Sequence, residues 1–293
     1  PVDSRTPKAS KPLAEAATAL RQTYRKQLAA IMAQDTTAED PIEIQPRISQ
    51  ELSDLADAAL EGALAIARNE VDGSEHVRFA IIGMGKLGAR ELNYVSDVDL
   101  IYVVEPADAD TNGMTLNRVG TKMATTLQRV CQSVIMGVAE PTLWQIDGGL
   151  RPEGKDGPLV RKLESHEAYY EQWAENWEFQ ALLKARPVAG DLGQAYMDMT
   201  RPFVWAASKR DNFVYDCQQM RKRVEDLIPA PLKDREIKLG RGGLRDVEFT
   251  VQMLQLVHGR ADETLRTSST LESLQRLAEG GYVSRRQAKK LSW

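Results

Sequence analysis

Two aspartates separated by one residue begin the apolar run SDVDLIYVVE, and a third ends the later run LWQID. These are Asp97, Asp99 and Asp147. Side chains alternate along a strand, so Asp97 and Asp99 are expected on one face, with Val98 and Leu100 toward the core. Carboxylates that share a small volume raise one another's pKa unless a cation lies between them. The three acids therefore predict a site for one or two Mg²⁺ ions that assists displacement at phosphorus. An isolated D-x-D pair is also common at solvated strand ends, so the prediction depends on Asp147.

Three glycines precede these acids in GMGKLG, residues 83 to 88, directly after an apolar run. The spacing matches a dinucleotide-binding turn. Such a turn needs a crossover of at least about 12 residues between parallel strands, whereas only ARELNYVS separates Gly88 from the next strand near Asp97. We therefore predict that the backbone N–H groups of this turn, with Gly83 and Gly85, face phosphate instead of a dinucleotide.

The elements that must position these residues change character along the chain. Residues 12–33 and 47–69 have helical spacing and are separated by a joint around Pro41 and Pro46. From residue 79 three strands are expected, FAIIGMG, DLIYVVE and TLWQID. A helix between the last two has one apolar face, formed by Leu116, Val119, Met123, Leu127, Val130 and Val134. After about residue 163 only helical patterns remain. The prediction is an α+β fold with segments 1–70 (helical), 71–162 (α/β core) and 163–293 (helical).

Composition restricts the classes of partner. The chain has 293 residues, 38 Lys and Arg against 42 Asp and Glu, and a net charge of −4, so no overall field favours nucleic acid or an anionic membrane. No apolar run approaches the ~18 residues of a membrane span. Cys131 and Cys217 lack metal-site spacing and are expected to be buried reduced thiols, as in a cytoplasmic protein. The chain starts without Met and stops inside a helical pattern, which we interpret as a piece of a longer protein.

Longer motifs carry a family resemblance. GMGKLGARELNYVSDVDLIYVVE, LRPEGKDGPLV, WEFQALLKARPVAGD and KLGRGGLRDVEFTVQMLQLVHG resemble the bifunctional glutamine synthetase adenylyltransferase/adenylyl-removing enzymes, of the actinobacterial type. The resemblance implies a DNA polymerase β-like nucleotidyltransferase core with N-terminal helices and a C-terminal helical region. It also implies two such halves in the full protein, of which one removes AMP from a tyrosine of glutamine synthetase and the other attaches it. The implied partners are adenylylated glutamine synthetase, a PII-type signalling protein and the C-terminal adenylyltransferase half.

The motif KLGRGGLRDVEF, residues 238 to 249, distinguishes the two halves. The removing half of the family resembles K-L-G-x-G-G-[LI]-R-[DE]-[VI]-E-F, whereas the transferring half usually lacks the basic residue that is Arg245 here. Removal is phosphorolysis, in which inorganic phosphate attacks the α-phosphorus and leaves as part of ADP, and an arginine fork suits a second anion. The glycines are also expected to open a helix N-terminus whose free N–H groups favour an anion. The resemblance thus implies deadenylylation, with candidate nucleotide- or phosphate-binding residues at Lys86, Ser96, Arg151, Lys238, Arg241 and Glu248.

Two other functions stay open. The same fold could catalyse ATP-dependent adenylylation, which a neutral residue at position 245 would favour. A non-catalytic module that binds glutamine synthetase or a PII-type protein would be favoured by loss of one of the three acids.

Several further groups of residues have two interpretations each. Arg245, Glu248, Gln252 and Gln255 form either a cleft lining or a solvated helix face; Tyr169, Trp173 and Trp177 form helix core or an adenine platform; Lys184 and Arg186 form surface salt bridges or bind phosphate.

Overall fold

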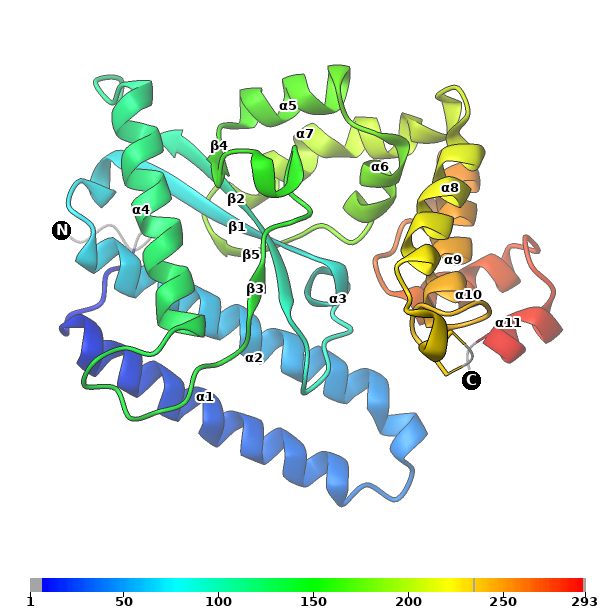
Figure 1. Ribbon diagram of the computed structural model, residues 1–293, viewed down its shortest axis with the longest axis horizontal. Helices are drawn as coiled ribbons and strands as arrows, with labels where there is room; N and C mark the ends of the chain where they lie inside the picture. The colour runs from blue at the N-terminus through cyan, green and yellow to red at the C-terminus, as the bar shows by residue number, and fades with distance from the viewer. Residues whose placement is uncertain (1–6, 234, 292–293) are drawn as a thin grey trace. The chain divides into compact units, whose positions relative to one another are not determined.

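The computed structural model describes residues 7–233 and 235–291, shown in Figure 1. Its α-helices are α1 (Leu13–Thr36), α2 (Pro41–Glu70), α3 (Gly85–Gly88), α4 (Gly113–Gln132), α5 (Leu163–Gln172), α6 (Asn176–Leu182), α7 (Gly193–Ala206), α8 (Phe213–Asp226), α9 (Leu244–His258), α10 (Thr270–Glu279) and α11 (Arg285–Leu291). Its strands are β1 (Val77–Met84), β2 (Val98–Pro106), β3 (Ile146–Asp147), β4 (Val160–Arg161) and β5 (Arg186–Gly190). The mixed helix and sheet content agrees with the predicted class. Within the described residues, no helix has the length and apolar character needed to cross a membrane.

The chain divides into two compact units. The first comprises Pro1–Tyr169 and Lys184–Met199, and the second comprises Tyr170–Leu183 and Thr200–Trp293. These units differ from the three segments expected from sequence, because α1 and α2 share one hydrophobic core with the sheet. The helical pair at the N-terminus is therefore part of the first unit.

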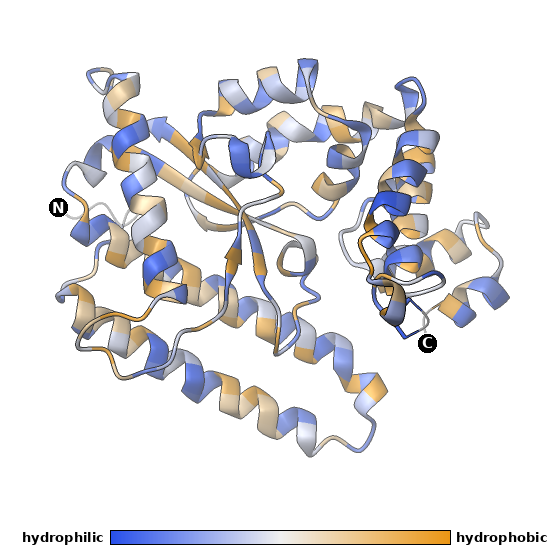
Figure 2. Cartoon of the chain, in the orientation of Figure 1, coloured by the Kyte–Doolittle hydropathy of each residue, from blue (hydrophilic) through white to orange (hydrophobic). Residues whose placement is uncertain are grey.

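The first unit is built on a sheet with the strand order β3-β2-β1-β5, and β4 pairs with β2 beside β3. β1 and β2 are antiparallel, with Val77 opposite Pro106 and Met84 opposite Asp99. A dinucleotide-binding unit requires parallel strands at this point, so the antiparallel pair confirms that the glycine turn is not of that class. Residues on both faces of β1 and β2 are buried, which explains their nearly continuous apolar sequences, seen in orange in Figure 2.

α2 continues through a proline that the sequence suggested as a joint. The helix begins at Pro41, where a missing N–H costs nothing, and Asp40 caps it by accepting from the N–H groups of Ile42 and Glu43. Pro46 removes one backbone hydrogen bond, but the helix is retained because the following turns bury a continuous apolar face. That face contains Ile48, Leu52, Ala56, Leu60, Ala63, Leu64 and Ala67.

α4 confirms most of its predicted apolar face, since Leu116, Val119, Met123, Leu127 and Val130 are buried. Val134 was wrongly included, because α4 ends at Gln132 and Val134 is 90% exposed. The strand expected at residues 142–147 is reduced to Ile146 and Asp147.

β5 was not predicted at all. Its sequence RPVAG contains a proline and a glycine, which are poor strand formers, and it becomes a strand by pairing with β1.

The described residues of the second unit form helices and connecting loops, without a strand. One of its hydrophobic clusters joins α9, α10 and α11 and is formed by Val251, Leu265, Leu274, Leu277 and Ala288. Burial changes along α9, because Val251 is 1% exposed whereas Leu244, at the start of the helix, is 65% exposed. The start of α9 therefore lies outside the apolar core of this unit.

Candidate active site

The sheet register places two of the predicted acids side by side. β2 and β3 run parallel, with Asp99 opposite Asp147 and Val98 opposite Ile146. Both aspartates are half-buried. Asp97 immediately precedes β2 and is exposed, next to the point where the N–H of Val98 donates to the carbonyl of Gln145 at 2.9 Å. Asp99 and Asp147 thus form a carboxylate pair at one sheet edge, with Asp97 at its outer end.

The glycine turn reaches the same carboxylate pair. Gly85 has a φ of +54°, and a Cβ placed on it would lie 2.3 Å from Oδ2 of Asp99. A glycine is therefore required both by the backbone angle and by the closeness of the carboxylate. Gly83 is similarly restricted, since its Cβ would lie 2.6 Å from Cγ2 of Val188. Lys86 follows in the one-turn helix α3.

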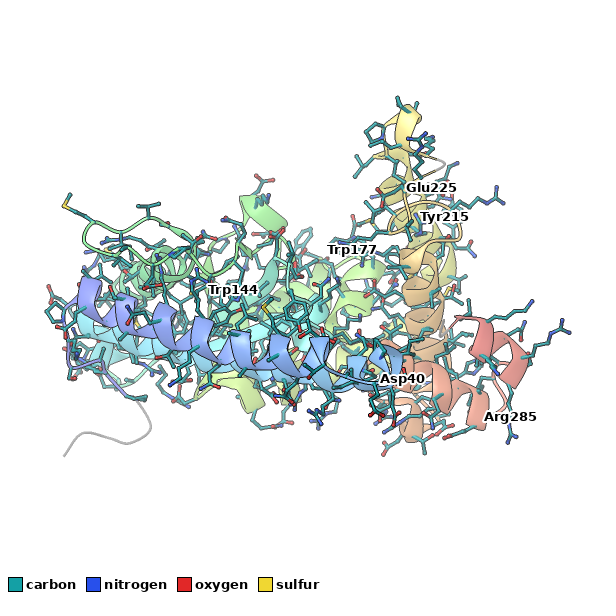
Figure 3. All side chains as sticks on the ribbon, turned by 90° about the horizontal axis from the view of Figure 1, so that it is seen from below. Asp40, Trp144, Trp177, Tyr215, Glu225 and Arg285 are labelled. Atoms are coloured by element: carbon teal, nitrogen blue, oxygen red, sulfur yellow. The ribbon has the colours of Figure 1, made fainter. Side chains whose placement is uncertain are left out.

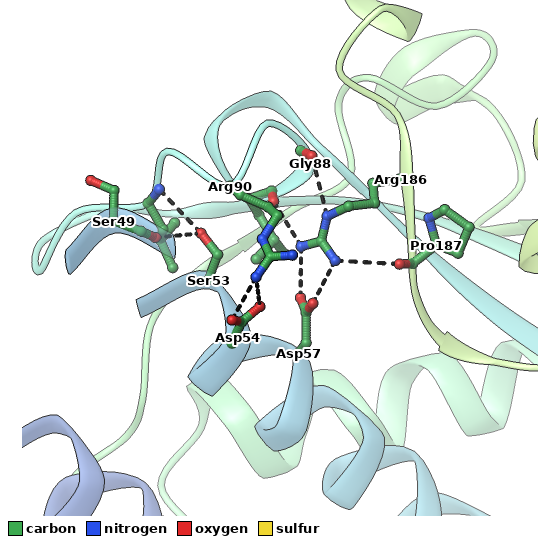
Figure 4. A network of polar contacts seen from close by, with 10 residues as sticks. Ser49, Ser53, Asp54, Asp57, Gly88, Arg90, Arg186 and Pro187 are labelled. Atoms are coloured by element: carbon green, nitrogen blue, oxygen red, sulfur yellow. Dashed lines mark hydrogen bonds and ion pairs between the residues drawn. The ribbon is translucent and has the colours of Figure 1, made fainter. Parts of the chain in front are cut away.

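An ion-pair network, half-buried at Arg186 and Asp57 and exposed at Arg90 and Asp54, fixes the far end of this turn, as Figure 4 shows. Arg186 donates to the carbonyls of Leu87 (3.0 Å) and Gly88 (3.2 Å), and its guanidinium also donates to both carboxylate oxygens of Asp57 at 2.5 and 3.0 Å. Burial raises the pKa of Asp57 although hydrogen bonding to Arg186 opposes this shift. Arg90, at a left-handed φ of 58°, pairs with Asp54 on the same helix. The turn is thereby held to α2 through two arginines.

Lys184 was expected on the surface, but it is only 4% exposed and its amine lies 3.2 Å from Oε2 of Glu91. A Cβ on Gly88 would lie 1.8 Å from the Lys184 carbonyl, so the chain passes directly over the turn. Lys184 and Arg186 both form the expected salt bridges, with Glu91 and Asp57, but Lys184 is buried and Arg186 half-buried because the sequence did not reveal β5, which draws this segment toward the sheet.

Arg151 organises the loop that follows Asp147. It donates to the carbonyl of Gly148 at 2.7 Å, to that of Gly157 at 3.1 and 3.3 Å, and to that of Lys155 at 3.1 Å. The N–H of Gly149 donates to Oδ1 of Asp147 at 2.8 Å. These contacts favour a bracing role for Arg151 in this loop over direct contact with a phosphate.

The donor set suits a hard divalent cation. Over residues 7–233 and 235–291, no group of three or more His, Cys, Asp or Glu side chains is arranged to hold a metal ion. Mg²⁺, however, is commonly held by only one or two carboxylates, with water and substrate phosphate completing its shell. Asp99 and Asp147 supply two carboxylates. The adjacent turn has no side chain at Gly85 that would obstruct a bound ion.

The motif in the second unit has a structure that the sequence did not predict. The first N–H groups of α9 are not free, because Leu244 donates to the carbonyl of Ile237 (3.0 Å) and Arg245 to that of Lys238 (2.9 Å). The expected anion site at this helix N-terminus is therefore wrong: the preceding segment folds back and caps the helix. Arg221 fixes the fold-back by donating to Asp246 at 2.5 Å and to the carbonyls of residues 239 and 240.

The side chain of Arg245, unlike its backbone N–H, is partly accessible. Its Nη1 donates to Oε2 of Glu248 at 2.7 Å, its guanidinium lies 5.9 Å from the ring centre of Phe249, and its side chain is 33% exposed. Lys238 and Arg241 are exposed in the capping segment. The three cations belong to one short segment of the second unit.

The rest of the polar stripe on α9 is buried rather than solvated. Gln252 accepts a hydrogen bond from Gln180 at 2.9 Å, and Gln255 donates to the carbonyls of Leu265 and Thr267, each at 2.8 Å. Their role is to join α6 and the loop before α10 to α9. Sequence periodicity identified the stripe but not its partners, which are distant in sequence.

The aromatic stripe at residues 169–177 does not form one helix face. α5 ends at Gln172, and Trp173 is 73% exposed. Together with Trp177 and Arg210 it lines a cavity of about 610 Å³ within the second unit. The prediction that this stripe is helix core is wrong for Trp173.

Comparisons with known proteins identify the family of the chain. The glutamate-ammonia ligase adenylyltransferase family profile matches residues 5–199, and the profile for the PII-uridylyltransferase GlnD matches residues 218–293. The chain is 83% identical over 294 aligned positions to the bifunctional glutamine synthetase adenylyltransferase/adenylyl-removing enzyme of Bifidobacterium longum subsp. infantis. It is 51% identical to the protein of the same name from Cutibacterium acnes, and 52% identical to that from Mycolicibacterium smegmatis.

These alignments cover 100%, 97% and 93% of the chain, but only 27%, 29% and 27% of the three relatives. The chain thus spans about a quarter of the length of the relatives it matches. Because the first family profile covers more than half of it, the chain belongs to the glutamate-ammonia ligase adenylyltransferase family.

Proposed function

We propose that this chain is a deadenylylating nucleotidyltransferase with a DNA polymerase β-like core. It would cleave AMP from the modified tyrosine of glutamine synthetase by phosphorolysis and yield ADP. The observation that carries the proposal is the Asp99–Asp147 register at the sheet edge, with the backbone of Gly85 against Asp99. The names of the relatives support glutamine synthetase as the protein substrate.

The carboxylate pair would hold Mg²⁺. Asp97 would become a third ligand only by moving toward the pair, because no group of three acids is preformed within the described residues. A bound Mg²⁺ would neutralise charge on the α-phosphate and on the departing tyrosyl oxygen. The chain's own contribution is to keep Asp99 and Asp147 on neighbouring strands. The clamped turn at Gly83–Gly88, with Lys86, and the nearby Ser96 would offer hydrogen-bond donors to the nucleotide phosphates.

Arg245 is the proposed residue for the attacking phosphate. Its pairing with Glu248 keeps the guanidinium oriented, and an incoming phosphate would compete with that carboxylate for the same N–H groups. Lys238 and Arg241 would add positive charge in the same segment. The reaction transfers the α-phosphorus from the tyrosyl oxygen to a phosphate oxygen, so no covalent enzyme intermediate is needed.

The test supplies adenylylated glutamine synthetase, Mg²⁺ and inorganic phosphate, and follows ADP by chromatography. We expect phosphate-dependent ADP that falls at least about 100-fold in Asp99→Asn and Asp147→Asn. Asp110→Asn, at an exposed position in the same unit, is the matched control and should keep parental activity. A folded chain that forms no ADP, or that releases free AMP without phosphate, would refute phosphorolysis.

Arg245→Ala tests whether this residue binds the attacking phosphate, as distinct from supporting catalysis in general. It should raise the KM for phosphate about tenfold or more with a smaller change in kcat, whereas Arg260→Ala, an exposed arginine just after α9, should not. An unchanged KM for phosphate would remove Arg245 from this role.

The competing functions predict other products. Adenylylation would consume ATP and release pyrophosphate with unmodified glutamine synthetase. A non-catalytic module would bind glutamine synthetase or a PII-type protein without forming either product. The match of residues 218–293 to a PII-uridylyltransferase profile makes a PII-type protein a reasonable proposed partner. The C-terminal half of the longer relatives is another proposed partner. We place the enzyme in the cytoplasm, consistent with two buried free cysteines.

A further inference from the structure

Four neighbouring residues of α1 contact the segment that leads from α4 to Asp147. They are Arg21, Gln22, Tyr24 and Arg25. Between the end of α4 at Gln132 and the start of β3 at Ile146 the chain has no regular helix or strand. The route of this segment, and with it the position of Asp147, must therefore be set by contacts from outside it.

Arg21 is the central contact. It is 1% exposed and donates to three backbone carbonyls: Val130 at 2.7 and 3.1 Å, Ser133 at 2.7 Å, and Glu140 at 3.0 Å. The first carbonyl lies in the last turn of α4, where backbone acceptors have no partner within the helix. One guanidinium thus joins the end of α4 to a point eight residues further along the connecting segment.

Two more side chains continue the line of contacts toward β3. Arg25 donates to the carbonyls of Pro141 and Thr142 at 2.7 and 2.9 Å. The indole N–H of Trp144 donates to the hydroxyl of Tyr24 at 3.1 Å, and the two rings pack edge to face. Trp144 is labelled in Figure 3, beside α1. Asp147 lies only three residues beyond this last contact.

The segment also has apolar contacts: Ile135 is buried in the core of the first unit, and Val138, Leu143, Trp144 and Ile146 pack against that core. The N–H of Leu143 donates to the carbonyl of Cys131 at 2.8 Å, and that of Ile146 donates to the side chain of Gln132 at 2.7 Å. Both partners are at the end of α4, which Arg21 itself ties to α1. β3 contributes only two residues to the sheet.

We infer that α1 is the positioning element for Asp147, and that Arg21 is a positioning residue for metal binding at the Asp99–Asp147 pair. The inference rests on the proposed function, in which this pair binds Mg²⁺. Residues that orient metal ligands typically change metal affinity about 10- to 100-fold when replaced. A helix outside the sheet would then control the strength of metal binding through the main chain of residues 130–144.

The experiment compares Arg21→Met with Arg68→Met in the 293-residue chain. Arg68, on α2 in the same unit, is also almost fully buried at 3% exposure, and its partners are the carbonyl of Pro7 and Glu61. Both variants lose a buried guanidinium, but only Arg21 contacts the segment before Asp147. Mn²⁺ binding is measured by electron paramagnetic resonance, hydrogen exchange of residues 143–147 by mass spectrometry, and thermal unfolding by circular dichroism.

We expect Arg21→Met to weaken Mn²⁺ binding about tenfold, toward the level of Asp147→Asn, and to speed exchange in residues 143–147. Arg68→Met should lower Tm but leave Mn²⁺ affinity within about twofold of the parent. Tyr24→Phe, which removes one hydroxyl and no packing volume, provides the same two readouts if Arg21→Met does not fold, and should change both in the same direction to a smaller extent.

The inference is overturned if the parent chain binds no Mn²⁺, or if the folded α1 variant leaves both Mn²⁺ affinity and exchange of residues 143–147 unchanged. It is also overturned if Arg68→Met reproduces the loss of affinity, because the effect would then follow from general destabilisation. Mn²⁺ binding and exchange need no substrate. A chain that shows the expected α1 effects but forms no ADP would therefore refute the proposed function and leave the positioning role intact.

Discussion

Replacing Gly85 by alanine should separate the stability of the chain from its chemistry. The added Cβ would lie 2.3 Å from Oδ2 of Asp99, about 1 Å closer than an ordinary contact. The backbone is fixed by β1 on one side and by the clamped end of α3 on the other, so the carboxylate is the part that moves. Asp99 would then be displaced from its place opposite Asp147.

Two costs follow from this substitution. Alanine at a φ of +54° destabilises the fold by about 1–2 kcal/mol. A displacement of about 1 Å in a reacting group costs roughly 100-fold in rate, which corresponds to about 2.7 kcal/mol of transition-state stabilisation. The chain should therefore stay folded at 25 °C while ADP formation falls about 100-fold.

Gly281→Ala is the matched control. Gly281 also has a positive φ, +79°, but a Cβ there meets nothing within 4 Å. Both variants should lower Tm by similar amounts in a calorimetric scan, and only Gly85→Ala should lose ADP formation and Mn²⁺ affinity. Equal activity of the two variants would show that the contact between Gly85 and Asp99 does not matter for catalysis.

Three further predictions concern stability and reactivity. Arg186→Met leaves the half-buried carboxylate of Asp57 without its main partner and should lower the free energy of unfolding by about 1–2 kcal/mol, as measured by urea denaturation. Burial lowers the pKa of His166 from 6.5 to about 3, so the unfolded state binds the extra proton between these values. The free energy of unfolding should fall by roughly 1.4 kcal/mol for each pH unit below 6.5, and the slope should be shallower in His166→Phe. Burial also raises the pKa of the Cys131 thiol to about 12, so this cysteine should resist iodoacetamide at pH 8 in the native chain and react only in urea, as followed by mass spectrometry; an equal rate in both conditions would contradict its burial.

The glycine turn and the two strands beside it lie within one short stretch of sequence, and their arrangement could be predicted from that stretch. The distance from Gly88 to Asp97 was enough to exclude a dinucleotide crossover, and strands β1 and β2 are antiparallel as that exclusion requires. The apolar spacing of α4 gave its buried face because a helix repeats its environment every three or four residues.

Contacts between distant segments were not accessible in this way. β5 has a proline and a glycine and takes its strand conformation from β1, so its local sequence gave no signal. The helical spacing of residues 12–33 does not indicate that Arg21 is buried, because the carbonyls that it contacts are more than 100 residues away. The start of α9 resembled an anion site because sequence shows the glycines but not the preceding segment that takes up its N–H groups.

The outer edge of β2 is a possible site of aggregation. Two separate strands of two residues each cover it, β3 at Val98–Asp99 and β4 at Tyr102–Val103. A proteolytic cut or a substitution that releases β3 would uncover the backbone of an apolar strand, which readily pairs with the same strand of another molecule. β3, the strand that carries Asp147, thus also covers an edge that could aggregate. Chains in which β3 is released should form intermolecular sheet before the first unit unfolds.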